Sequence, residues 1–171
     1  MDKYELTEEN IKVEGKTLYR IKALTNFNDV KAGDLGGYVE SEDNLSQDGT
    51  CWVYGDAEVY DNAKIFDNAE VYGNAQVYEN AKVYEFTQVY DNALVYGNAE
   101  VTGYAEVYGN AQVYENAWIY GKAKIFDNSH IYDKAQVRGK DKVYGNAKIH
   151  NQIDLENHLT KQRLIEAICN L

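Results

Sequence analysis

The sequence of 171 residues contains no proline, only three histidines and only two cysteines. Cys51 and Cys169 lie far apart, so no disulfide framework is indicated and a reducing, cytoplasmic compartment is expected. No apolar run approaches the length of a membrane span, and the first residues do not have the pattern of a signal peptide. The histidines lack a shared spacing for zinc, so neither a metal nor another cofactor is expected.

Positive charge is also scarce, and its distribution is uneven. The formal net charge is −11, which disfavours a protein that simply coats nucleic acid. Residues 1–121 carry 8 Lys/Arg and 22 Asp/Glu, whereas residues 122–171 carry 9 Lys/Arg and 6 Asp/Glu. The molecule should therefore be electrically polar along its length.

The sequence is rich in tyrosine, with 16 residues, most of them in a six-residue repeat. From Val53 to Ile149 every sixth residue is Val or Ile, and a small residue follows four positions later. A period of six is not helical, but it suits a short strand followed by a tight corner. We expect Val and Ala to face inward and Asn to occupy the corner, because Asn tolerates a left-handed backbone. Such hexads predict a parallel β-helix.

The unit Val-Tyr-x-Asn-Ala-x resembles the hexapeptide repeat of left-handed β-helix proteins, in which three units form one coil of eighteen residues. The segments FNDVKAGDLGGYV (27–39) and LSQDGTCWVY (45–54) resemble the start of YdcK-type bacterial proteins and similar phage proteins. The resemblance implies an all-β fold, a left-handed parallel β-helix of about six coils at residues 39–152. It also implies a homotrimer. An N-terminal β-hairpin cap is expected at 1–38 and a C-terminal amphipathic α-helix at 153–171.

Both ends depart from the hexad. Residues 3–24 alternate charged and apolar groups around Glu14-Gly15-Lys16, which predicts a hairpin that covers the open edge of the first coil. Near the C-terminus, apolar residues fall on one helical face with Asp154 as the expected N-cap; they are Leu155, Leu159, Ile165, Ile168 and Leu171, with Leu164 beside them. This helix is expected to cover the last coil, to dock on a neighbouring subunit, or both.

One edge of the expected rod breaks the pattern. Two corner columns are mostly Asn, whereas the third runs Asn68, Phe86, Tyr104, Lys122 and Lys140. An aromatic step followed by a cationic step is typical of a site for a planar anionic ligand or a protein partner. The candidate residues are Tyr84, Phe86, Thr102, Tyr104, Tyr120, Lys122, Arg138 and Lys140. The alternative is that this edge only tunes coil packing or forms the trimer contact.

No catalytic constellation is evident. The resemblance to hexapeptide-repeat acyltransferases implies a His general base near an extruded loop, but the regular frame leaves no loop, and His130 and His150 occupy outward positions. The leading hypothesis is a non-catalytic binding protein that captures a host protein or a small anionic ligand. The resemblance to phage proteins implies that it is encoded by a phage and acts against host defence. The alternatives are a hexapeptide-class acyltransferase and an acidic rod that imitates DNA.

Overall fold

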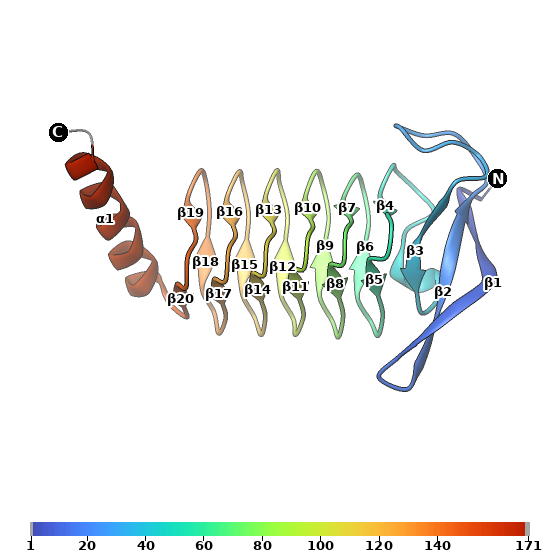
Figure 1. Ribbon diagram of the computed structural model, residues 1–171, viewed down its shortest axis with the longest axis horizontal. Helices are drawn as coiled ribbons and strands as arrows, with labels where there is room; N and C mark the ends of the chain where they lie inside the picture. Colours follow the sequence, from blue (N-terminus) through green and yellow to red (C-terminus); the bar gives the residue numbers. More distant parts are fainter. Residues whose placement is uncertain (1, 170–171) are drawn as a thin grey trace.

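The computed structural model describes residues 2–169, which form a parallel β-solenoid rod with a small N-terminal lobe and one C-terminal helix (Figure 1). The lobe contains β1 (Tyr4–Val13), β2 (Lys16–Ala23), β3 (Leu35–Val39) and a 3-10 turn, η1 (Glu42–Asn44). The two-residue strands β4 to β20 follow, and the helix α1 spans Gln152–Cys169. The rod has about six turns, as the hexads predicted. Its left hand stays a prediction from the resemblance.

Three parallel sheets form the faces of the rod. Face 1 contains β4 (Trp52–Val53), β7 (Glu70–Val71), β10 (Gln88–Val89), β13 (Glu106–Val107), β16 (Lys124–Ile125) and β19 (Lys142–Val143). Face 2 contains β5 (Glu58–Val59), β8 (Gln76–Val77), β11 (Leu94–Val95), β14 (Gln112–Val113), β17 (His130–Ile131) and β20 (Lys148–Ile149). Face 3 contains β6 (Lys64–Ile65), β9 (Lys82–Val83), β12 (Glu100–Val101), β15 (Trp118–Ile119) and β18 (Gln136–Val137).

The repeat explains this arrangement directly. Each strand residue pairs with the residue eighteen positions later, as Val59 does with Val77. The second residue of each two-residue strand is a Val or Ile that is at most 2% exposed, and the repeat alanines fill the space beside them. Thr87 and Ser129 replace Ala without leaving a polar atom unsatisfied, because each hydroxyl donates at 2.8 Å to a backbone carbonyl three residues earlier.

Three columns of corners join the faces. Corner 1 follows face 1 (54–57, 72–75, 90–93, 108–111, 126–129, 144–147), corner 2 follows face 2 (60–63, 78–81, 96–99, 114–117, 132–135), and corner 3 follows face 3 (66–69, 84–87, 102–105, 120–123, 138–141). The backbone role predicted for Asn here was wrong. The positive φ falls on the residue before it, such as Asp91 (φ 58°) or Gly73 (φ 71°).

The corner Asn residues instead form side-chain ladders along the rod. The amide of Asn74 donates to Asn92 Oδ1 at 3.2 Å, and that of Asn92 donates to Asn110 Oδ1 at 3.3 Å. Identical amides stacked at the coil spacing satisfy one another's donors and acceptors, so the ladder, not a left-handed backbone, accounts for Asn at this position.

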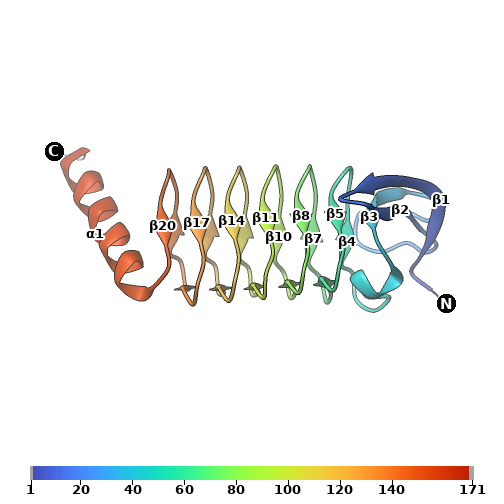
Figure 2. The same cartoon turned by 90° about the horizontal axis from the view of Figure 1, so that it is seen from below.

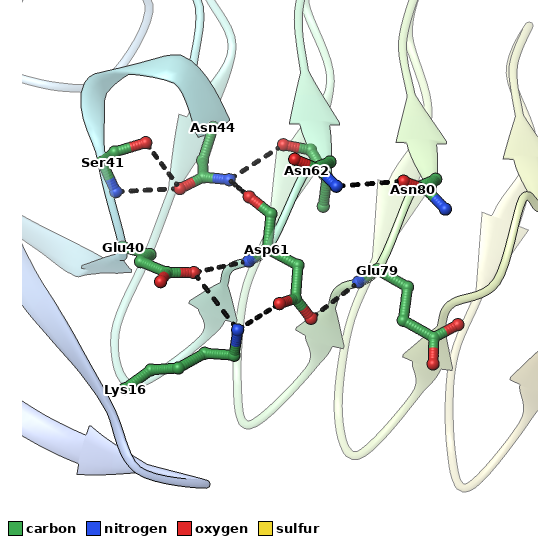
Figure 3. Close-up of polar contacts among 9 residues, drawn as sticks. Lys16, Glu40, Ser41, Asn44, Asp61, Asn62, Glu79 and Asn80 are labelled. Carbon is green, nitrogen blue, oxygen red and sulfur yellow. Dashed lines mark hydrogen bonds and ion pairs between the residues drawn. The ribbon is translucent and has the colours of Figure 1, made fainter.

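The hairpin predicted to cover the first coil is confirmed. β1 and β2 are antiparallel, β2 pairs antiparallel with β3, and β3 pairs parallel with β5, so the hairpin extends face 2 past the first coil (Figure 2). Because β3 belongs to both parts, it crosses the boundary expected after residue 38. Figure 3 shows the polar anchor, in which Lys16 contacts Glu40 and Asp61, and Asn44 donates to the carbonyl of Asp61.

The C-terminal helix begins at Gln152, one residue earlier than expected, and inclines away from the last coil (Figures 1 and 2). The N-cap prediction was wrong, because Asn151 Oδ1 accepts the backbone N–H of Asp154 at 3.0 Å. Leu155 is buried, and Leu159 packs against the core. The side chains of Ile153, Leu164, Ile165 and Ile168 are exposed. The helix therefore covers the last coil as far as Gln162, whose side-chain amide donates to the carbonyl of Lys142 at 3.1 Å. Leu171 lies outside the described residues.

Between residues 2 and 169, no helix combines the length and apolar character that a membrane crossing requires.

Candidate binding edge

The aromatic step predicted from the sequence, Phe86 and Tyr104, lies on corner 3. Phe86 and Tyr104 occupy the Asn position of consecutive coils, and their rings stack with centroids 5.0 Å apart and planes 4° from parallel. Phe86 is 51% exposed and Tyr104 is 57% exposed. Isolated exposed apolar residues are ordinary, but two stacked aromatic faces form a continuous apolar surface on a rod whose other corners are mostly polar.

The cationic step continues this column. Lys122 Nζ lies 5.7 Å from the centroid of the Tyr104 ring, within the range of a cation–π contact. Lys140 follows one coil later, and Arg138 is exposed at the start of the same corner. The structure thus places Phe86, Tyr104, Lys122 and Lys140 in one column, which runs along the edge between faces 3 and 1.

Three of the predicted residues lie deeper. Tyr84 stacks on Phe66 at 4.7 Å and is half-buried. Thr102 is 7% exposed, and its hydroxyl donates to Glu85 Oε2 at 3.0 Å. Tyr120 is also half-buried. These side chains are less exposed than Phe86 and Tyr104, so they offer less surface to a ligand.

Sequence reasoning missed Trp118, whose ring is 39% exposed and lies 4.5 Å from that of Tyr120. It occupies the outward position of β15, where the other strands of face 3 carry Lys, Glu or Gln. The sequence could have revealed Trp118. Grouping the outward strand residues by face shows that Trp118 is the exception on face 3, just as grouping the corner residues showed that Phe86 is an exception at corner 3.

A groove of about 460 Å³ lies beside the aromatic step. Its lining consists of Asn28, Thr50, Asn68, Glu70, Phe86, Gln88, Tyr104 and Glu106. Asn28 comes from the loop between β2 and β3, which Figure 1 shows projecting from the N-terminal lobe beside the first coils. This end of the edge is acidic, whereas Lys122, Arg138 and Lys140 belong to its other end.

Comparison with known proteins identifies the scaffold. A family model described as the YdcK β-solenoid repeat matches residues 88–103. The Escherichia coli K12 protein named "Uncharacterized acetyltransferase YdcK" is 49% identical over 37 residues, which is 22% of this chain. The chain is a hexapeptide-repeat β-solenoid protein. The aligned segment spans only 11% of the length of that relative. The family match includes Thr102 and the groove residue Gln88 but neither Phe86 nor Tyr104, so it does not cover the exposed aromatic stack.

Recurring acidic residues have a structural role in this hexapeptide-repeat β-solenoid. The corner carboxylates Asp61, Asp67, Asp91, Glu115 and Asp127 each accept the backbone N–H of the residue eighteen positions later, at 2.9–3.3 Å. Figure 3 shows the first case, from Glu79 to Asp61. These hydrogen bonds account for several of the acidic residues. The regular spacing of acidic residues along the sequence is therefore not by itself evidence that the rod imitates DNA.

The histidines of the solenoid lie apart from the edge. His150 stacks on Tyr132 at 5.7 Å, and its Nδ1 pairs with Asp154. His158 lines a groove of about 320 Å³ between the last coil and α1, and burial lowers its pKa. Burial also lowers the pKa of His130 on face 2. Within residues 2–169 no three potential metal ligands come together.

Proposed function

We propose that this hexapeptide-repeat β-solenoid is a non-catalytic binding protein that captures its partner on corner 3. The observation that carries the proposal is the exposed stack of Phe86 on Tyr104, in a position where the other corners carry paired Asn side chains. Covering an aromatic side chain contributes about 2 kcal/mol. Exposed aromatic and Arg side chains are the usual energetic centres of protein interfaces.

The shape of the edge favours a protein partner over a small anionic ligand. From Phe86 to Lys140 the column covers three coil spacings, roughly 15 Å. The cations Lys122, Arg138 and Lys140 would attract acidic groups of that partner. A phage origin and a role against host defence belong to this proposal as its biological setting, and their support is the resemblance of residues 27–39 and 45–54 to phage proteins.

Affinity capture from a bacterial lysate tests the proposal. The edge variant combines Phe86→Asn, Tyr104→Asn, Lys122→Asn and Lys140→Asn, which restores the residue found at most other corners. Lys134→Asn is the matched control, because Lys134 interrupts the Asn column of corner 2. The expected result is a partner recovered with the wild type and the control but lost with the edge variant. Equal recovery by all three proteins contradicts the proposal.

A second candidate is an acyltransferase of the hexapeptide class. The observation in its favour is the pairing of His150 Nδ1 with Asp154, which leaves Nε2 of a half-exposed imidazole free to act as a base. The named relative is described as an acetyltransferase, and the aligned segment is short. Acetyl-CoA at millimolar concentration should raise the melting temperature if it binds. His150→Gln should abolish acetyl transfer while His130→Gln retains it, and the absence of any melting shift rejects this candidate.

A further inference from the structure

We propose that the acidic end of the edge binds a cationic group, the guanidinium or ammonium of an Arg or Lys side chain on the captured protein. This inference rests on the proposed function, because the aromatic step forms one wall of the pocket concerned. It names the chemistry of the partner at that pocket, whereas the sequence suggested a planar anionic ligand or a protein partner for the edge as a whole.

Two grooves meet at Glu70. The first is the groove beside Phe86 and Tyr104, and the second, of about 310 Å³, is lined by Asp29, Tyr54, Glu70 and Tyr72. Face 1 supplies the floor of both, and the loop between β2 and β3 supplies Asn28 to the first and Asp29 to the second. Together they form one depression around the Glu70 carboxylate, flanked by corner 3 on one side and corner 1 on the other.

Aromatic rings line both sides of this depression. Phe86 and Tyr104 stack at corner 3, and Tyr54 meets Tyr72 edge to face at corner 1 with centroids 6.3 Å apart. The faces of such rings carry partial negative charge, so they attract a cation that approaches within about 6 Å. Tyr104 already has Lys122 over its ring, and the faces that Phe86 and Tyr104 turn to each other are covered, so a guest cation would contact the remaining ring faces beside the carboxylates.

The carboxylates leave negative charge for a ligand to neutralise. Lys124 pairs with Glu106 at 2.7 Å. Glu70 receives the amide of Gln88 at 2.9 Å, and Asp29 receives the hydroxyl of Tyr54 at 2.9 Å, both from neutral donors. The residues that line the two grooves include neither Lys nor Arg. A guanidinium beside Glu70 would gain a charge-assisted hydrogen bond and stack against an aromatic wall.

The chain itself offers a matched control. Glu58 on face 2 is also half-buried and accepts the amide of Gln76, eighteen residues later, at 2.9 Å. It thus reproduces the hydrogen bond from Gln88 to Glu70, but it lies outside both grooves. Glu70→Gln and Glu58→Gln each remove one carboxylate that accepts a Gln side-chain amide from the next coil. Any difference between them reports on the pocket and not on the net charge of the protein.

The experiment measures binding of a fluorescent tetra-arginine peptide by anisotropy, with tetra-citrulline as its neutral isostere. The expected result is that the wild type and Glu58→Gln bind tetra-arginine within about twofold of each other, while Glu70→Gln binds roughly tenfold more weakly. Asp29→Asn serves as a second variant if circular dichroism shows that Glu70→Gln is unfolded. Tetra-citrulline should bind at least about tenfold more weakly than tetra-arginine to the wild type.

Three outcomes overturn the inference. Equal weakening by Glu70→Gln and Glu58→Gln indicates general attraction to an acidic chain, equal binding of tetra-citrulline indicates a neutral stacking surface, and absence of tetra-arginine binding indicates no cation site. Lysate capture separates this inference from the proposed function. If Glu70→Gln still captures the partner and the edge variant does not, the edge binds without the cation pocket, and only the inference fails.

Discussion

The ring of Tyr78 lies parallel to the ring of Tyr96 one coil later, with centroids 4.9 Å apart and planes 2° from parallel. Corner 2 continues this stack through Tyr114 to Tyr132, and corner 1 carries a second one. Both stacks are half-buried. Their occurrence on two corners indicates that the tyrosines stabilise the coils by contact between neighbouring rings.

The tyrosine stacks should make the protein sensitive to alkaline pH. Burial raises the pKa of Tyr78 to about 12, and it also raises the pKa of Tyr96 and Tyr114. Between about pH 10, where an unfolded tyrosine ionises, and the higher folded values, the unfolded state has released protons that the folded state retains. The stabilisation is therefore complete below pH 10 and is lost as pH rises to about 12.

Urea unfolding over this pH range measures the effect. Tyr78→Phe should keep the stack, because Phe126 stacks on Tyr108 at 5.0 Å, and it should reduce the fall in unfolding free energy. An unchanged pH slope in Tyr78→Phe would show that this phenol does not contribute.

The Asn ladder should contribute measurable stability. Asn92 accepts one side-chain hydrogen bond from Asn74 and donates another to Asn110, so Asn92→Ala should lower the unfolding free energy by about 1 kcal/mol. Asn146→Ala is the control, since within residues 2–169 the last ladder bond of corner 1 runs from Asn110 to Asn128 and does not involve Asn146. Chemical denaturation should show a smaller loss for the control. If both variants lose the same unfolding free energy, the loss comes from the change of residue at the corner backbone and not from the Asn ladder.

The inward Val positions should dominate the stability of each coil. Val95 is fully buried, and Val95→Ala should lower the unfolding free energy by about 2 kcal/mol through lost burial and an unfilled cavity. The preceding residue, Leu94, faces outward on the same strand, so Leu94→Ala should cost only about 0.5 kcal/mol. Denaturant midpoints that fall equally for both variants would contradict the assignment of inward and outward positions.

The homotrimer implied by the resemblance stays a prediction, and α1 is the contact that we propose for it. Leu164 and Ile168 lie one turn apart and are 61% and 70% exposed, which leaves apolar surface without a partner in the described chain. Leu164→Gln with Ile168→Gln should reduce the mass measured by light scattering from trimer to monomer. Phe86→Asn with Tyr104→Asn should leave it unchanged. A monomeric wild type rejects the trimer.

The sequence alone determined the rod and its deviant corner. Every coil is built in the same way, with an inward Val or Ile at every sixth residue and three such units per coil. The pairing partner of a strand residue therefore lies eighteen positions away. Counting in eighteens therefore predicted that Phe86, Tyr104 and Lys122 share one column, as the structure confirms. The same periodicity placed His130 and His150 on the outside.

Only the tertiary structure decided what surrounds that column. The loop that brings Asn28 and Asp29 to face 1 has no period in common with the coils, so no counting rule relates Asp29 to Glu70. Hydrogen bonds between side chains and the backbone were also decided by the tertiary structure. Asn151, and not Asp154, caps the helix, because the local direction of the backbone determines which side chain reaches the free N–H groups. A repeat encodes contacts between equivalent positions, whereas contacts between unlike segments depend on how the ends of the chain fold back onto it.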